Sequence, residues 1–258
     1  MSSLGIINKW FSDLYDQEET QIEDVNFLFS VIGKNEKNIL EVCCGSGRIL
    51  VPLAKAGHSV TGFDMDENML AHISSKAKEL TNIRFSKADA IASSWGENFD
   101  IVVLAGNILI NIVSDINYKE AQKLFIKKAY DSLKTNGHVY IDFNCFSNPQ
   151  KSFINPNERT IFEGTDSFGN YGKSSIYDSK YEERTQITTF KRKIEITTKA
   201  GERIVKESDC VKHIPTLAQV REWLEETGFK IIQEYGDYKG EPISETSNRA
   251  IIWAEKIK

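Results

Sequence analysis

The feature that most constrains the fold is a regular alternation of short apolar runs with longer amphipathic segments between residues 38 and 143. The apolar runs are rich in Ile, Val, Leu and Phe, as expected of strands that are buried on both faces. Strands that alternate with helices are joined by right-handed crossovers and form an open, mostly parallel sheet. The expected strands span residues 38–43, 58–63, 83–86, 99–104 and 138–143.

The flanking segments add a helical part before this region and an antiparallel part after it. Residues 6–32 are amphipathic and predict one or two helices ahead of the first strand. From about Cys145 to His213 the helical spacing stops, and residues of alternating polarity predict strands with a hairpin turn at 199–202. The chain then predicts a helix at residues 217–226 with Gly228 as its end, and two closing strands at residues 229–235 and 249–255.

Together these elements predict the α/β fold class: a seven-stranded, mostly parallel Rossmann-like sheet with helices on both faces and an antiparallel β insertion after strand 5. We expect an N-terminal helical cap at residues 1–36 and a core formed by residues 37–144 and 214–258. The antiparallel β insertion is expected at residues 145–213.

Composition excludes several classes of protein. A formal net charge of -5 argues against a broad electrostatic grip on nucleic acid or on anionic membranes. The run Lys191–Lys193 is a local exception, and its simplest interpretation is a solvated strand end. No apolar run approaches the roughly 20 residues of a membrane span, and no secretory leader is evident. The four cysteines form no pattern typical of disulfides or of a metal site, so we expect no metal and a cytoplasmic protein.

A glycine-rich turn joins the first expected strand to the helix that follows it, over Glu41–Arg48. Glycines without a Cβ let the backbone approach a ligand closely, and the start of a helix presents unpaired N–H groups. Such a turn also occurs for purely structural reasons. Dinucleotide-binding turns have a small third residue at the position that Leu50 occupies here, which argues against a nicotinamide or flavin enzyme.

Acidic residues follow the next two strands on the same edge of the sheet. Asp64 ends the second strand, where a carboxylate can accept hydrogen bonds from both hydroxyls of a ribose; alternatively, it caps the next helix. Asp89 follows the third strand. Because the carboxyl ends of parallel strands lie along one edge, the turn and both acids are expected in one row, where ligands of such folds bind.

These segments resemble the class I S-adenosylmethionine-dependent methyltransferases of small-molecule type. The similarity extends over residues 38–143 and 216–255, with the family's motifs at residues 40–48, 60–70, 87–90, 99–107 and 216–229. It implies S-adenosyl-L-methionine as cofactor and S-adenosyl-L-homocysteine as product. It also implies that the antiparallel insertion covers the substrate site, with aromatic residues such as Phe153, Phe162, Tyr171, Tyr177 and Tyr181.

The resemblance also implies roles for individual residues. Glu41 would orient the turn and the methionine amino group, Asp64 would hold the ribose, and Asp89 would accept from the adenine amino group. Met65 would pack on the adenine face, and Asn107 would lie beside the methionine end. The complete set of expected cofactor-binding residues is Tyr15, Glu41, Gly45, Ser46, Gly47, Arg48, Asp64, Met65, Asp89, Ala90 and Asn107.

The expected reaction is transfer of a methyl group to an N or O atom of a small-molecule acceptor by in-line displacement. The enzyme is expected to act as a monomer or homodimer, without nucleic-acid or membrane partners. No catalytic residue is assigned, since His138 and His213 are more typical of structural histidines. An RNA methyltransferase, supported by the basic run at 191–193, and a non-catalytic S-adenosylmethionine-binding protein are the alternatives.

Overall fold

A computed structural model describes residues 2–257. Its backbone contacts divide the chain into two compact units. The core unit is formed by Gln21–Ser147 and the chain from Pro215 onward. The insertion unit is formed by the chain up to Thr20 and by Asn148–Ile214.

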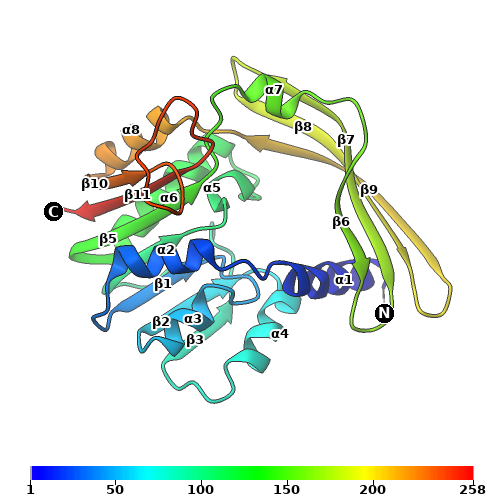
Figure 1. Ribbon diagram of the computed structural model, residues 1–258, viewed down its shortest axis with the longest axis horizontal. Coiled ribbons are helices and arrows are strands. Elements are labelled where there is room, and N and C mark those ends of the chain that lie inside the picture. The colour runs from blue at the N-terminus through cyan, green and yellow to red at the C-terminus, as the bar shows by residue number, and fades with distance from the viewer. Residues whose placement is uncertain (1, 258) are drawn as a thin grey trace. The chain divides into compact units, whose positions relative to one another are not determined.

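The core unit is built on a seven-stranded sheet with the order β10-β11-β5-β4-β1-β2-β3 (Figure 1). The pairs within β5-β4-β1-β2-β3 are parallel, whereas β11 pairs antiparallel with both β5 and β10. The expected fold class is therefore confirmed. The strands are β1 (Asn38–Val42), β2 (Ser59–Asp64), β3 (Ile83–Lys87), β4 (Phe99–Leu104), β5 (Leu133–Phe143), β10 (Phe229–Tyr235) and β11 (Ala250–Lys256).

Helices pack on both faces of this sheet, because β1 and β4 are apolar on both sides and nearly every residue of theirs is buried. One face packs against α2 (Glu23–Ile32), α3 (Leu50–Lys55) and α4 (Glu67–Lys76). The other packs against α5 (Ile108–Asn111), α6 (Tyr118–Ser132) and α8 (Leu217–Thr227). Apolar residues from both sets of helices thus bury the central strands and fix the strand ends in place.

Helix α8 begins and ends where its sequence indicates. Thr216 caps its start in a capping box with Gln219, so that two backbone N–H groups of the first turn are satisfied. Gly228 ends it with a φ of 104°, a conformation that residues with a Cβ adopt only under strain. Local capping signals therefore set the two limits of this helix, and its buried residues Val220, Trp223 and Leu224 pack it on the sheet.

The insertion unit is a four-stranded antiparallel sheet in the order β6-β7-β8-β9, with α1 packed on one face. Trp10 of α1 is fully buried against this sheet, and Gly172 makes room for it: a Cβ there would lie 2.4 Å from the indole. We call this side of the sheet the α1 face. The elements are α1 (Ser3–Glu18), α7 (Pro149–Phe153), β6 (Arg159–Thr165), β7 (Tyr171–Glu182), β8 (Ile187–Thr197) and β9 (Arg203–His213).

Two sequence interpretations differ from the structure. The N-terminal cap expected at residues 1–36 is divided: α1 belongs to the insertion unit, whereas α2 packs on the sheet of the core unit. The run Lys191–Lys193 lies in the middle of β8, not at a strand end. The first difference arises because apolar residues in β8 and β9 form a surface that packs against α1. The second arises because β8 extends on both sides of the basic run and pairs with β9 over its whole length.

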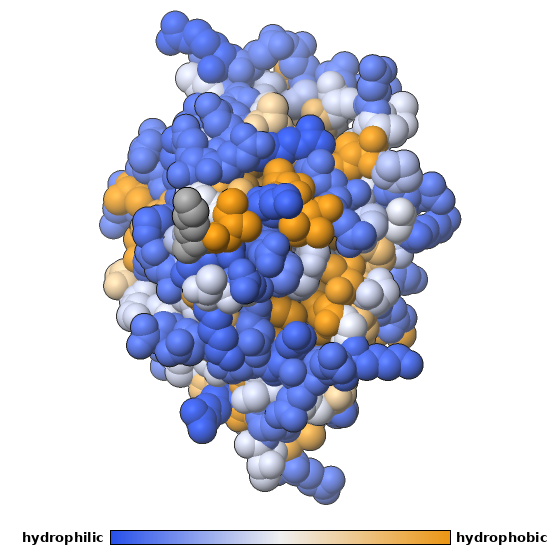
Figure 2. Space-filling view, turned by 90° about the vertical axis from the view of Figure 1, so that its left-hand side faces the viewer, coloured by the Kyte–Doolittle hydropathy of each residue, from blue (hydrophilic) through white to orange (hydrophobic). Residues whose placement is uncertain are grey.

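The surface gives further information about the expected partners. Within residues 2–257, no helix is long and apolar enough to cross a membrane, and no cluster of side chains is suited to hold a metal ion. Figure 2 shows a face on which hydrophilic residues predominate, with hydrophobic ones in separate patches between them. The exposed large apolar side chains come from many different elements, Val113, Ile232 and Ile257 among them.

Candidate functional site

The carboxyl ends of β1 and β2 form the centre of the candidate site, and the two glycines of the turn after β1 have different tasks there. Gly47 has a φ of 79°, and a Cβ on it would lie 2.8 Å from Ile73 of α4, so its absence allows close packing. Gly45 has a φ of 53°, and a Cβ on it would meet no atom within 4 Å. The space beside Gly45 is thus open to a ligand.

Glu41, near the end of β1, is the most unusual side chain of the site. It is 5% exposed, and its Oε2 is buried without a hydrogen-bond partner among the described residues. Burial raises the pKa of Glu41 to about 8, although Arg48 and the N–H of Leu50 act in the opposite direction. A buried carboxylate oxygen without a donor is costly, and a cationic group placed next to it would remove that cost.

Asp64 connects the glycine turn to the start of α4. Its Oδ2 accepts from the N–H of Gly45 at 3.0 Å, and its Oδ1 accepts from the N–H of Asp66 at 2.9 Å. Asp64 is not the cap of α4: that role belongs to Asp66, whose carboxylate accepts from the N–H of Asn68. The capping alternative is therefore wrong, and the position of Asp64 beside Gly45 fits a carboxylate directed at a ligand.

Arg48 and Ser46 are occupied by structural contacts. The guanidinium of Arg48 forms a two-pronged ion pair with Asp24 of α2, in which Nη1 lies 2.7 Å from Oδ1. Ser46 is buried, and its carbonyl accepts from Nζ of Lys76 at 3.0 Å. These contacts hold the turn against α2 and α4, and they account for both residues without a cofactor. Direct cofactor contacts from either residue stay a prediction.

The loop after β3 is held in place by a lysine of α6. The carboxylate of Asp89 accepts from the N–H of Ile91 at 2.7 Å, which closes a tight turn. Lys128 of α6 donates through Nζ to the carbonyls of Ala90, Ile91 and Ser93, at 2.6 to 2.8 Å. Burial lowers the pKa of Lys128. Sequence reasoning missed this lysine, because no local pattern links Lys128 to the loop after β3.

The remaining expected residues are spread more widely. Met65 is 58% exposed beside Asp64, as a residue that packs on a ligand would be. Asn107 has a φ of 63°, and its Oδ1 accepts from the N–H of Asn144, so its side chain ties the end of β4 to the end of β5. Tyr15 belongs to the insertion unit, where its ring lies 6.5 Å from that of Phe162. The binding roles of all three stay predictions.

A buried polar cluster at the end of β5 is absent from the sequence-based set. Asp142 is 1% exposed and accepts from Tyr238 at 2.8 Å and from the guanidinium of Arg249. The Arg249 guanidinium also lies over the ring of Tyr238, 4.6 Å from its centroid. A charged residue within an otherwise apolar strand needs such partners. An aspartate in the run Tyr140–Phe143 was the signal that could have identified the cluster.

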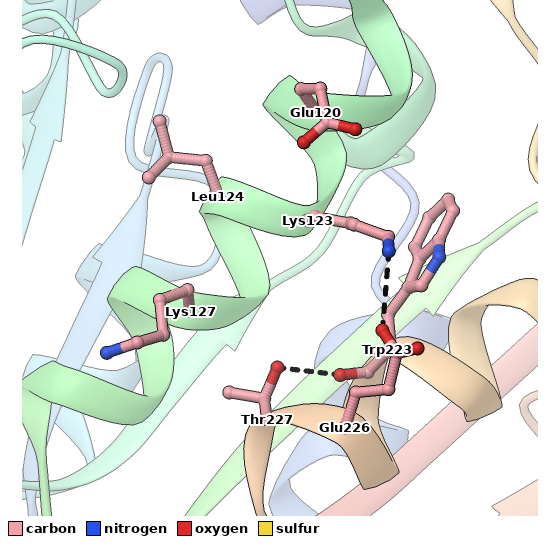
Figure 3. A pocket seen from close by; sticks show the side chains of 7 residues that line it. All are labelled: Glu120, Lys123, Leu124, Lys127, Trp223, Glu226 and Thr227. Carbon is pink, nitrogen blue, oxygen red and sulfur yellow. Dashed lines mark hydrogen bonds and ion pairs between the residues drawn. The ribbon is translucent and has the colours of Figure 1, made fainter.

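Apart from the strand ends, a hollow lies between α6 and α8 (Figure 3). Trp223 is one of its lining residues, and Lys123 and Glu226 form an ion pair there with an N–O distance of 3.3 Å. None of the expected cofactor-binding residues lines this hollow. Lys123 and Glu226 pair with each other, and Lys127 pairs with Asp131 outside the hollow.

Two histidines, His138 and His213, are weighed as catalytic candidates on the basis of the sequence. His138 lies within β5, where its ring stacks on Trp253 with centroids 4.5 Å apart, and burial lowers its pKa. His213 is buried at the end of β9, in the insertion unit. Both observations agree with the structural interpretation of these residues.

This chain resembles known proteins both in sequence and in fold. Residues 39–137 match the family described as methyltransferase domain. A protein of Geobacillus sp. (strain WCH70) that is named as a methyltransferase is 28% identical over 222 residues, which cover 85% of each chain. The CcbJ methyltransferase from Streptomyces caelestis shares the fold with a TM-score of 0.74 and 17% identity, over 97% of this chain and 98% of that one. CalS10 from Micromonospora echinaspora, an amino pentose methyltransferase solved with S-adenosylmethionine bound, has a TM-score of 0.64 and 14% identity, with 94% of each chain covered.

Proposed function

The chain is an S-adenosylmethionine-dependent methyltransferase, and on this premise we propose that it methylates an N or O atom of a small-molecule acceptor. The insertion unit is the observation that carries the proposal. The match to an amino pentose methyltransferase covers 94% of this chain, so it includes most of the insertion unit. The net charge of -5 also favours a small acceptor over a polyanion.

We propose that Glu41 and Gly45 receive the methionine part of the cofactor. The unpartnered Oε2 of Glu41 fits the cofactor's ammonium group, and the open space beside Gly45 fits its chain. Both features are properties of this chain's own residues.

We assign the nucleoside part to the ends of β2 and β3. Each carboxylate oxygen of Asp64 has accepted one backbone N–H, and each has a second lone pair for a ribose hydroxyl. Asp89 would accept from the adenine amino group, and Met65 would cover the base. The turn held by Lys128 would keep Asp89 and Ala90 in place.

The protein's share in the reaction is to align the acceptor and to exclude water. The cofactor supplies an activated methyl group on sulfur when it is bound. Holding the acceptor atom in line with that group contributes more to the rate than any single acid or base. A base is needed only for an acceptor that arrives protonated, and no histidine among the described residues directly follows the carboxyl end of a strand of the core unit.

An RNA acceptor is disfavoured by the register of β8. Side chains of successive residues in a strand point to opposite faces, so Lys191 and Lys193 lie on one face and Arg192 on the other. The basic run therefore does not form the continuous cationic surface that phosphate backbones require.

Calorimetric titration with S-adenosylmethionine, S-adenosylhomocysteine and NAD tests the cofactor assignment. We expect micromolar binding of the first two and none of NAD. Methyl transfer from labelled cofactor to a panel of amine and hydroxyl metabolites, with bulk RNA and protein as parallel acceptors, tests the acceptor class. Transfer to RNA or protein alone would overturn the small-molecule proposal.

A further inference from the structure

The edge of the core sheet continues beyond the strand ends to which we assign the cofactor. Those ends belong to β1, β2 and β3, at one side of the sheet order (Figure 1). The ends of β4 and β5 continue the edge, and β11 begins there because it runs antiparallel to β5. Ligands of open α/β sheets bind along this edge, so a polar side chain on its second half is a candidate for ligand binding.

A salt bridge between Asp142 and Arg249 lies on this second half of the edge. Asp142 is the last residue but one of β5, and Arg249 directly precedes β11. Asp142 faces the α2 side of the sheet, because Ile251, its direct neighbour on β11, belongs to the apolar cluster that includes α2. Both of its carboxylate oxygens have a donor: Oδ1 accepts from Nη1 of Arg249, and Oδ2 accepts from the hydroxyl of Tyr238 at 2.8 Å.

Hydrogen bonds connect this salt bridge to the end of β4. The N–H of Asn107 donates to the carbonyl of Asp142 at 3.3 Å, and the N–H of Asn144 donates to Oδ1 of Asn107 at 2.6 Å. We expect Asn107 beside the methionine end of the cofactor, which is the end that carries the transferred methyl group. On this assignment, the salt bridge lies next to the place where cofactor and acceptor meet.

The guanidinium of Arg249 keeps donors for a further partner. An arginine has five N–H donors, and among the described residues this side chain donates a hydrogen bond only to Asp142. The ring of Tyr238 lies 4.6 Å from Cζ and covers a flat face of the guanidinium, which uses no N–H group. The side chain is 25% exposed, so a ligand can reach it. Arg48 differs, because both of its terminal nitrogens pair with Asp24.

Asp142 and Tyr238 thus hold a cation that still has hydrogen bonds to donate, and such a group suits a planar anion. Guanidinium groups bind carboxylates through charge-assisted hydrogen bonds, which are about twice as strong as neutral ones. We propose that Arg249, held in place by Asp142, binds the carboxylate of a ligand at the end of β5. This role rests on the proposed function and deepens it, because it names a chemical group that the site recognises. Two molecules of the reaction are sources of such a group: the cofactor, through its methionine part, and an acceptor that is itself an acid.

Two measurements on the full chain distinguish these sources. Calorimetry compares S-adenosylhomocysteine with its decarboxylated analogue, which keeps the amino group. If the cofactor supplies the carboxylate, the wild type should bind S-adenosylhomocysteine roughly tenfold or more tightly than the analogue, and Arg249→Gln should remove that preference. Methyl transfer from labelled cofactor compares amino acids and hydroxy acids with their own amides. If the acceptor supplies the carboxylate, the wild type should prefer the acids in kcat/KM by a similar factor, and Arg249→Gln should remove this preference.

Both readouts are ratios, which separates recognition from stability. Arg249→Gln leaves Asp142 buried without its cation and therefore costs stability, but a partly unfolded sample changes the values for both ligands alike. Combining Asp142→Asn with Arg249→Gln removes both charges and should lose the same preference. The matched control is Arg221→Gln, because Arg221 also pairs with a carboxylate of the core unit, that of Glu234. It should change either ratio less than about twofold.

The proposal is overturned if the wild type shows neither preference, if every preference of the wild type persists in Arg249→Gln, or if Arg221→Gln removes it as well. These results leave the proposed function intact as long as S-adenosylhomocysteine binds and a small molecule is methylated. No binding of S-adenosylhomocysteine at all, or methyl transfer to RNA or protein alone, would show instead that the proposed function is wrong, and the role of Arg249 would be lost with it.

Discussion

Replacing Glu41 by glutamine should stabilise the cofactor-free protein and, at the same time, weaken its binding of the cofactor. The carboxyl group has a pKa of about 8 in the folded chain, against its ordinary value of 4.5. Between these two values the folded state holds a proton that the unfolded state has released. The free energy of unfolding therefore falls as the pH rises through this window. Glutamine has the same shape and never has to ionise.

The size of the effect follows from the shift. Each pH unit is worth ~1.4 kcal/mol, so the advantage of Glu41→Gln should be near zero at pH 4.5, ~2 kcal/mol at pH 6 and at most ~5 kcal/mol by pH 8. Binding should show the reverse. An ammonium group that pairs with Glu41 requires the carboxylate, so the affinity of the wild type for S-adenosylhomocysteine should rise about tenfold per pH unit from pH 6 towards 8.

Urea denaturation at pH 5, 6, 7 and 8 measures the first effect, and calorimetry over the same range measures the second. The range stays below the pH at which the ligand's own amino group loses its proton. In buffers of different ionisation enthalpy, the heat of binding should report the release of about one proton at pH 6. Glu79→Gln, at an exposed position of the same chain, is the control and should change neither property. Stability and affinity that do not depend on pH, with Glu41→Gln equal to wild type in both, would refute the reasoning.

Three further predictions concern the same edge of the sheet. Gly47→Ala should lower the free energy of unfolding by ~1–3 kcal/mol, because Gly47 has a positive φ and an added Cβ would press against Ile73. Gly45→Ala should lower the free energy of unfolding less and weaken cofactor binding more. Denaturation and calorimetry on both variants measure the two losses, and a larger loss of stability in Gly45→Ala, or a larger loss of affinity in Gly47→Ala, would contradict this prediction. Asp64→Ala should weaken S-adenosylhomocysteine binding by ~1–3 kcal/mol with the fold intact by circular dichroism, and unchanged affinity would show that the ribose assignment is misplaced. Lys128→Met should loosen the Asp89 turn and thereby reduce the ratio of binding affinities for S-adenosylhomocysteine and its 6-oxo analogue. Lys127→Met, at an exposed position, is the control. An unchanged ratio in Lys128→Met would leave the lysine with a purely structural role.

Most of the core unit was predictable because its determinants are local. An apolar strand such as β4 needs no partner to be recognised, and the expected range 99–104 is the observed one. Thr216 and Gly228 set the limits of α8 by their own capping chemistry. The location of Glu41 and Gly45 also followed, since strand ends of a parallel sheet share an edge.

What could not be predicted depends on contacts between distant residues. β7 contains Gly172, Ser174 and Ser175, which have little preference for strands, and its place in the sheet depends on packing against Trp10. The partner of Arg48 in α2 and the attachment of Lys128 to the loop after β3 are likewise invisible in sequence spacing. The unpartnered oxygen of Glu41 was also beyond the sequence, which shows that an acid is present but not whether a donor faces it.

The assignment of α1 to the insertion unit has a consequence for synthesis of the chain on the ribosome. The indole of Trp10 donates to the carbonyl of Gly164, a residue 154 positions later, and its apolar neighbours Ile196 and Ile204 follow later still. Helix α1 thus emerges before every other described element and is among the last to be buried. Until β9 has left the ribosome, the apolar stripe of Ile7, Trp10 and Leu14 has no sheet to cover it. We therefore expect this stripe to be a binding site for chaperones, or a starting point for aggregation, during synthesis.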